Sequence, residues 1–128
     1  MCSSDLLIHE AQKNKKISIF NNGNFFRDLI FISDVISAIN IILKKGKPGN
    51  LYWISSGKKT RFDNFAKLLK KQTDCKINFP PTPKYTKKVD VGNFVVDNKK
   101  LRRLGWKVNN SIEEGVSKTL DYFKNQKD

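Results

Sequence analysis

Apolar residues recur along the chain in two spacings, one typical of amphipathic helices and the other of short strands. In five stretches the spacing fits a helix that buries one side against a core. The expected helices are residues 4–13; a helix after Ser33-Asp34 with Val35, Ile36, Ile39, Ile42 and Leu43 on its buried side; one after Thr60 bearing Phe62, Phe65, Leu68 and Leu69; residues 99–104; and one after Ser111 bearing Ile112, Val116, Thr119, Leu120 and Phe123.

Polar residues and glycines mark where these helices begin and end. Ser33 or Asp34 can cap the second helix, because a short polar side chain accepts hydrogen bonds from the first turn. Thr60 with Asp63 resembles a capping box, and Ser111-x-x-Glu114 is a second one. Glycine at positions 46 and 105 ends the second and fourth helices.

Short apolar runs between the helices predict strands at residues 17–20, 29–32, 51–54 and 76–79, with one more extended piece at 94–96. The run at 29–32 is continuously apolar, which is typical of a strand buried on both faces. Residues 82–93 have no period and predict a loop. Short strands alternating with amphipathic helices place the chain in the α/β class, and 128 residues suit one domain.

Composition excludes several classes of protein. With 38% hydrophobic residues the chain can bury a core, yet no apolar run reaches the roughly 18–20 residues of a membrane span. The first ten residues do not have the pattern of a signal peptide. Cys2 and Cys75 form no disulfide framework, and His9 alone supplies almost no ligands for a metal. We therefore expect a cytoplasmic domain with no metal site and no membrane partner.

The formal net charge is +13, from 25 basic and 12 acidic residues. Of the basic residues 21 are lysines, spread in short pairs from end to end, and only four are arginines. Base readout favours the forked guanidinium of arginine, so specific nucleic-acid binding is not expected. A weak affinity for anions, including nucleotides, follows from the charge itself.

Complete catalytic motifs are missing from these 128 residues. There is no G-x-G-x-x-G dinucleotide loop, no phosphate-binding P-loop and no Tyr-x-x-x-Lys pair. His9 has no nearby nucleophile or orienting partner, so it is expected to be a plain surface histidine. The sequence predicts no catalytic residue in this chain.

Three segments in order nevertheless match a known pattern: NGNFFRDLIFISDV at 22–35, LYWISSGKKT at 51–60, and VDNKKLRRLGWK at 96–107, which leads into SIEEG at 111–115. Together they resemble the C-terminal part of the NAD-dependent epimerase/dehydratase family, the extended short-chain dehydrogenases that act on nucleotide sugars. The match covers nearly the whole chain. Trp53 and Ser55 replace the usual Asn and Gly of the family's Y-N-I-G turn.

The resemblance implies three substrate-binding residues. Arg27 matches the family's RD arginine and would contact the diphosphate of a nucleotide sugar, for which a guanidinium fork is suited. Its alternative role is a salt bridge with Asp28 or Asp34, which are expected to be a turn anchor and a helix cap. A family R-P-G-D loop places Lys87 at its arginine and Asp90 at its aspartate.

In that loop Lys87, or its neighbours Lys84 and Lys88, would neutralise a diphosphate, and Asp90 would accept from ribose hydroxyls. The alternative is a solvated loop with a run of charge. The whole chain, residues 1–128, would be the substrate-binding portion, and residues 29–44 would complete the sheet of a Rossmann half expected before Met1. That half would carry the NAD site, so no cofactor is expected for this chain alone, which would be inactive.

Two consequences and two alternatives follow from this hypothesis. Alone, the chain would expose an apolar strand and a helix face made for absent neighbours, which predicts self-association. It would be either a piece of a larger protein or a shortened natural reading frame. The alternatives are a basic stand-alone module with weak nucleic-acid or anion binding, and a remnant that folds without serving catalysis.

Overall fold

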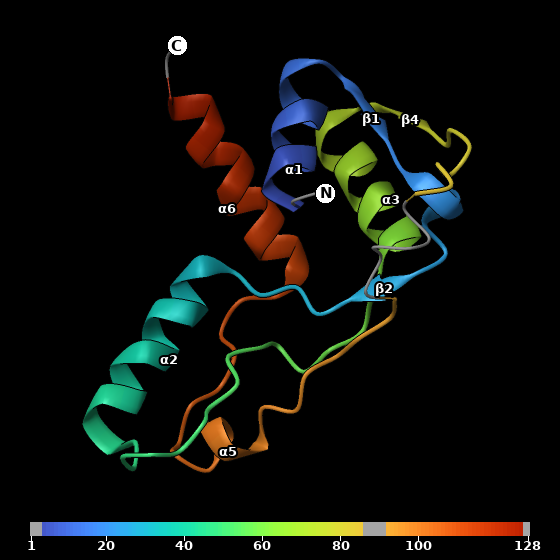
Figure 1. The fold of residues 1–128 in the computed structure, drawn as a ribbon. Coiled ribbons are helices and arrows are strands. Elements are labelled where there is room, and N and C mark those ends of the chain that lie inside the picture. The colour runs from blue at the N-terminus through green and yellow to red at the C-terminus, as the bar shows by residue number, and fades with distance from the viewer. Residues whose placement is uncertain (1–3, 86–91, 127–128) are drawn as a thin grey trace.

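The computed structural model describes residues 4–85 and 92–126. Its elements run in the order α1 (Ser4–Lys13), β1 (Lys16–Ser18), the 3-10 turn η1 (Phe20–Gly23), β2 (Phe26–Arg27), α2 (Ile32–Lys45), β3 (Thr60–Arg61), α3 (Phe62–Thr73), β4 (Lys76–Asn78), α5 (Lys99–Arg102) and α6 (Ile112–Asn125). Figure 1 shows α1, α3 and α6 gathered at one end, and α2 and α5 at the other.

Two small sheets tie distant parts of the chain together. β1 and β4 pair in parallel with Ile17 opposite Ile77, and β2 and β3 pair antiparallel with Arg27 opposite Thr60. The strands predicted at 17–20 and 76–79 are therefore confirmed, although β1 ends at Ser18. The chain turns there into η1, where Asn21 and Asn22 adopt left-handed conformations with φ of 52° and 51°, which asparagine tolerates better than most residues.

The larger core lies between α1, α3, α6 and the β1–β4 pair. Its buried members come from all of these elements: Leu7, Ile8, Ala11, Ile17, Ile19, Phe62, Phe65, Ala66, Leu69, Cys75, Val116 and Leu120. The faces expected for the third and last helices are the faces found here. Ser111 caps α6 in the expected box: its hydroxyl accepts from the Glu114 amide at 3.2 Å, and the Glu114 carboxylate accepts from the Ser111 amide at 2.8 Å.

A smaller core joins α2 to α5 and to the segment that follows it. Ala38, Leu101 and Trp106 are buried there, and the partly buried residues packed around them are Ile30, Ile41, Ile42, Ile54, Leu104 and Val108. The indole Nε1 of Trp106 donates to the hydroxyl of Ser37 at 2.9 Å. This core is small, with three buried residues.

The strands predicted at 29–32 and 51–54 are not present as strands, and the extended piece predicted at 94–96 is not paired in a sheet either. Residues 29–31 and 51–54 belong to no helix or strand, and Ile32 already belongs to α2. A strand is defined by its pairing, and within residues 4–85 and 92–126 no neighbour pairs with these segments. The prediction of strands from these apolar runs is therefore wrong, because no segment among the described residues pairs with them.

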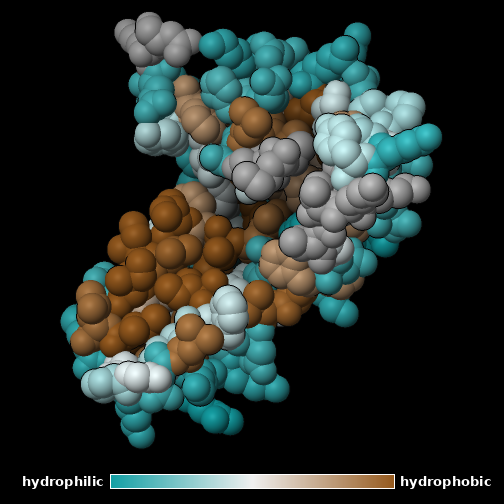
Figure 2. All heavy atoms as spheres, in the orientation of Figure 1, coloured by the Kyte–Doolittle hydropathy of each residue, from teal (hydrophilic) through white to brown (hydrophobic). Residues whose placement is uncertain are grey.

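The prediction for α2 is wrong in two respects. Much of the expected buried side is exposed: Ile36 by 54%, Ile39 by 45% and Leu43 by 79%, together with Ile32 by 60%. Figure 2 shows the resulting broad hydrophobic area over α2. Neither Ser33 nor Asp34 caps the helix, whose N-cap is Phe31 without a side-chain bond. Ile32, Ile36, Ile39 and Leu43 are as hydrophobic as a buried helix face, but no core covers that side of α2.

The capping box expected at Thr60 and Asp63 is also wrong. Thr60 lies in β3, α3 begins at Phe62, and Asp63 pairs with Arg61 instead of with Thr60. Pairing of Thr60 with Arg27 keeps the chain extended, and the helix begins one residue later than the pattern predicted. No helix in the described part of the chain is long and apolar enough to cross a membrane.

Candidate functional site

Arg27 lies on β2 between two aromatic rings. Its guanidinium carbon is 4.8 Å from the ring centre of Phe25 and 5.6 Å from that of Phe94, distances at which a cation is attracted by the ring face. Its Nη1 donates to the carbonyl oxygens of Gly92 at 2.6 Å and Phe26 at 3.1 Å. The rings and carbonyls hold the guanidinium in one orientation.

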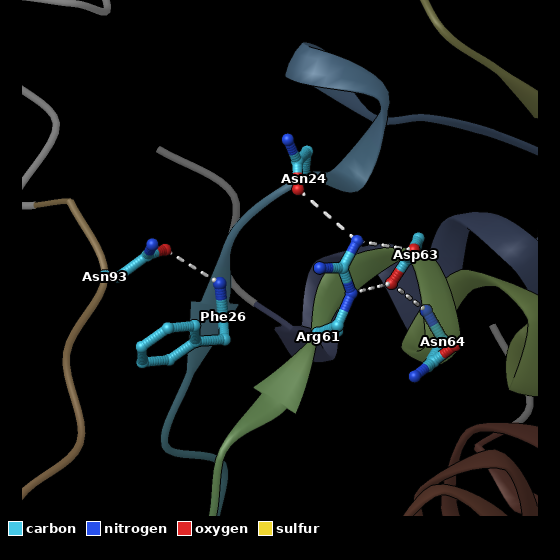
Figure 3. A network of polar contacts seen from close by, with 6 residues as sticks. All are labelled: Asn24, Phe26, Arg61, Asp63, Asn64 and Asn93. Atoms are coloured by element: carbon cyan, nitrogen blue, oxygen red, sulfur yellow. Dashed lines mark hydrogen bonds and ion pairs between the residues drawn. The ribbon is translucent and has the colours of Figure 1, made fainter.

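The segment at 92–96 is fastened along β2 by three bonds. Besides the Arg27–Gly92 contact, the side-chain oxygen of Asn93 accepts from the amide of Phe26 at 3.0 Å, as Figure 3 shows. The amide of Val96 donates to the carboxylate of Asp28 at 3.2 Å. Residues about 65 positions apart in the sequence therefore meet at β2.

Asp28 connects β2 and residues 92–96 to a third segment, at Ser56 and Gly57. Its carboxylate also accepts from the amide of Ser56 at 2.8 Å, the hydroxyl of Ser56 at 2.6 Å and the amide of Gly57 at 3.1 Å. Gly57 has a φ of 70°, in the region where only glycine is free of strain. The expected role of Asp28 as a turn anchor is confirmed.

Asp34 is 1% exposed and holds a loop instead of a helix end. Its carboxylate accepts from the amides of Asn109 at 3.0 Å and Asn110 at 3.1 Å, and from the side chain of Asn110 at 3.1 Å. Both carboxylates considered as partners for Arg27 thus hold backbone amides. The sequence did not predict this use of Asp34, because the loop it binds lies 75 residues away.

A second polar group lies beside the β2–β3 ribbon (Figure 3). Arg61 donates from Nε and Nη2 to the two carboxylate oxygens of Asp63 at 3.1 and 3.0 Å, and from Nη2 to the side chain of Asn24 at 3.3 Å. The hydrogen bond from Arg61 holds the pKa of the Asp63 carboxyl below its ordinary value. Lys59 lies 5.2 Å from the ring centre of Phe26 on the same ribbon. The ribbon therefore carries three cations: Arg27, Lys59 and Arg61.

Two of the three predicted site residues, Lys87 and Asp90, lie outside the described residues, as does Lys88. Lys84 is described and exposed, at the near end of that loop. The structure brings Arg27 to Gly92, which follows Asp90 by two positions. The contributions of Asn93, Phe94 and Lys59 were missed, because a loop amide, an aromatic and one lysine among many give no distinct signal.

The chemistry of this site is that of anion binding. A guanidinium held in one orientation is the kind of group that can hold phosphate oxygens. Lys59 and Arg61 lie on the other face of the ribbon, because Arg61 is opposite Phe26 and Arg27 is opposite Thr60. Among the described residues no three His, Cys, Asp or Glu side chains are grouped to hold a metal ion.

Comparison with known proteins supplies a context for this site. The model of a family described as GDP-mannose 4,6-dehydratase matches residues 5–119. A trifunctional UDP-glucose 4,6-dehydratase/epimerase/reductase of Arabidopsis thaliana is 27% identical over 117 residues, which cover 88% of this chain and 17% of that protein. The human dTDP-D-glucose 4,6-dehydratase is also 27% identical, over 88% of this chain and 34% of its own length.

A solved structure agrees with these relatives. The Bordetella bronchiseptica enzyme WbmF, in complex with NAD+ and UDP, is 28% identical and superimposes with a TM-score of 0.76, over 94% of this chain and 35% of its own. The chain thus spans between about a sixth and a third of the length of these three proteins. Its α/β fold corresponds to one part of an extended short-chain dehydrogenase.

Proposed function

Because the chain belongs to the GDP-mannose 4,6-dehydratase family, we propose that it is the C-terminal, nucleotide-sugar-binding portion of an NAD-dependent nucleotide-sugar epimerase or dehydratase. In this proposal the chain binds the nucleotide diphosphate, and the NAD site and the reacting groups lie in a Rossmann half. The chain alone is then inactive, while the complete enzyme oxidises a sugar hydroxyl by hydride transfer to NAD.

The observation that carries the proposal is the contact between Arg27 and Gly92. It joins the strand that bears one proposed substrate-binding residue to the segment that follows the other two, Lys87 and Asp90. Arg27 and Lys87 would neutralise the diphosphate, and Asp90 would accept hydrogen bonds from the ribose. Stacking between Phe25 and Phe94 keeps the guanidinium in place, which lowers the entropy lost on binding.

The test is a titration of the chain with UDP and with inorganic pyrophosphate, followed by calorimetry and amide NMR. Loss of one charge-assisted contact is worth about 1.5–3 kcal/mol, so Arg27→Gln should weaken UDP binding at least about tenfold. Arg102→Gln removes the same charge from α5 and should leave the affinity nearly unchanged. Equal weakening by both variants would mean that only net charge matters, and the proposal would fail.

Asp90 gives a sharper readout, because it is assigned to the ribose. Asp90→Asn should weaken UDP while leaving pyrophosphate unaffected, whereas Lys87→Gln should weaken both. A chain that binds double-stranded DNA with a steep salt dependence, and ignores UDP, would favour the basic-module alternative instead.

The exposed apolar face of α2 is a candidate contact surface for the Rossmann half and for a second copy of the chain. We propose that residues 29–44 complete the sheet of the Rossmann half in the full enzyme, and that α2 buries Ile36, Ile39 and Leu43 against it. In the chain alone the same apolar surface would drive self-association. Analytical ultracentrifugation of the 128-residue chain tests the latter: a single monomeric species from 5 to 500 μM would refute it.

A further inference from the structure

The net charge of the chain is concentrated around the smaller core. Residues 35–59 and 92–108, which form most of that core, contain ten lysines and arginines but a single acidic residue, Asp97, and so carry +9 of the net +13. Lysines occur along the whole chain, so the concentration arises because acidic residues are missing from these two segments. A surface with so few carboxylates attracts anions over a longer range than any single side chain does.

Seven of these cations lie at one end of the molecule, where the last turn of α2 meets α5 (Figure 1). The ammonium of Lys100 donates to the side-chain oxygen of Asn50 at 3.3 Å, and that of Lys45 lies 3.9 Å from the position that a Cβ of Gly105 would occupy. Leu101 is buried and anchors α5, whereas the residues on both sides of it are exposed. We call this surface the basic end; its members, all exposed, are Lys44, Lys45, Lys47, Lys99, Lys100, Arg102 and Arg103.

The positive charge of the basic end is little neutralised. The ammonium of Lys99 is 3.6 Å from the carboxylate of Asp97, and both side chains are more than 60% exposed. Because water and salt screen so exposed an ion pair, it contributes little to stability and leaves both groups open to other partners. Even if that pair is counted as neutral, the basic end carries six positive charges.

The residue types at the basic end distinguish between kinds of polyanion. Residues 44–50 and 99–103 contain no aromatic residue, and Leu101 is buried. Proteins hold single-stranded nucleic acid with aromatic rings on which bases stack, and they hold bilayers with apolar side chains that insert. The surface offers charge without rings, which suits the phosphates of a duplex, spaced at one charge per roughly 1.7 Å of helix axis. Leu43 and Leu51 flank residues 44–50, so an anionic bilayer is the alternative that the experiment must separate.

We propose that the basic end binds double-stranded DNA through its phosphates, independently of base sequence. Five of the seven cations are lysines, which act as point charges, and contacts to phosphate carry no sequence information. The basic end lies apart from Arg27 on β2 (Figure 1), so one chain can bind both a duplex and a nucleotide. The basic-module alternative differs from this proposal, because it has no nucleotide site.

The experiment measures the binding of a labelled duplex of about 20 base pairs to the full chain by fluorescence anisotropy, between about 50 and 200 mM salt. Each phosphate contact contributes about −0.9 to the slope of log K against log salt concentration. Five such contacts give a slope of about −4.5, which is the expected result. A second duplex with the same composition and a scrambled sequence should bind equally well.

Two double variants test whether α2 and α5 contribute to one surface. Lys44→Gln with Lys45→Gln removes the pair of cations in the last turn of α2, and Arg102→Gln with Arg103→Gln removes a pair at α5. Each double variant should lower the steepness of the slope by about 1.8 and weaken binding at least about tenfold at 50 mM salt. If circular dichroism shows that one of them is unfolded, the other still tests the surface.

The matched control is Lys70→Gln with Lys71→Gln. These two exposed lysines occupy the last turn of α3 as Lys44 and Lys45 occupy that of α2, but α3 belongs to the other group of helices (Figure 1). The control removes the same charge and should leave the slope nearly unchanged. Equal weakening by all three double variants would mean that only net charge matters, and it would overturn the basic end as a binding surface.

Two other results would also overturn the proposal. The first is no binding of the duplex at about 1 mM chain, a concentration above the usual dissociation constants of non-specific complexes. The second is binding to vesicles of phosphatidylserine and phosphatidylcholine without binding to the duplex at the same salt, which would assign the surface to a membrane. Neither result affects the proposed nucleotide site, because UDP affinity is tested at Arg27.

Discussion

Replacement of Asp28 by asparagine tests whether one carboxylate holds the site together. Asp28 accepts four hydrogen bonds, two from Ser56 and one each from Gly57 and Val96. Asparagine has nearly the same shape, but one of its oxygens becomes an NH2 group. In Asp28→Asn the oxygen can still accept from Ser56, while the new donor faces the amides of Gly57 and Val96, which are donors themselves.

The magnitude follows from the bonds lost. Leaving a partly buried donor without an acceptor costs about 1–3 kcal/mol, and two such amides lose their partner here. Because Asp28 is only half-buried, water recovers part of this, and we expect a loss of about 3 kcal/mol in the free energy of unfolding. With a urea slope of about 2 kcal/mol/M for a small domain, the midpoint should fall by roughly 1.5 M.

The assay is urea denaturation, followed by the fluorescence of Trp53 and Trp106. Asp121→Asn is the matched control, because Asp121 is exposed and its ion pair with Lys124 spans 4.0 Å, so its removal should change the free energy by less than about 0.5 kcal/mol. A shift for Asp28→Asn as small as that of the control would refute the reasoning. If the reasoning holds, the variant should also bind UDP more weakly, since Val96 and the preceding loop are released from β2.

Three further changes address other parts of the molecule. Asp34→Ala leaves the amides of Asn109 and Asn110 without their acceptor and should lower the free energy of unfolding by about 3 kcal/mol in the same denaturation assay. Ser111→Ala removes the side-chain cap of α6 and should cost about 1 kcal/mol, whereas Ser111→Asp should retain most of the stability. Arg61→Gln should raise the pKa of the Asp63 carboxyl toward its ordinary 3.8, as measured by NMR titration. The wild-type carboxyl is stabilised at neutral pH and loses that benefit only as the pH falls through its lowered pKa, so an unchanged titration curve would contradict the pairing.

Helices and their packed faces were largely predictable from the sequence. The pattern of α3 and α6 places Phe65 and Val116 in the core, and the Ser111 box needs only local residues. The exceptions depend on distant contacts: Thr60 stays in a strand because Arg27 lies opposite, and Asp34 turns away from its helix to a loop 75 residues later. The strands predicted at 29–32 and 51–54 are missing for another reason. An apolar pattern indicates that a segment can pair as a strand, but it does not show whether a pairing partner is present.

Of the candidate site, the sequence could supply the family and Arg27, because the RD motif and its flanking residues are distinctive. The relatives and the matched family model confirm the resemblance to NAD-dependent epimerases and dehydratases. The sequence could not supply the surroundings of Arg27, since the rings of Phe25 and Phe94 are brought together only by the fold. The assignments of Arg27, Lys87 and Asp90 as substrate-binding residues remain predictions.

The parallel pairing of β1 with β4 has a consequence for how the chain folds. Lys16 pairs with Lys76 and Ser18 with Asn78, so 60 residues separate the partners. Closing a loop of that length lowers the chain entropy before any contact offsets the loss, so such pairings form late and slowly. During synthesis, α1 and β1 emerge before α3 and β4, and they must wait until those two elements have left the ribosome. Until then Leu7, Ile8 and Ile17 have no core to enter, and this interval is when the nascent chain is most open to aggregation or to chaperones.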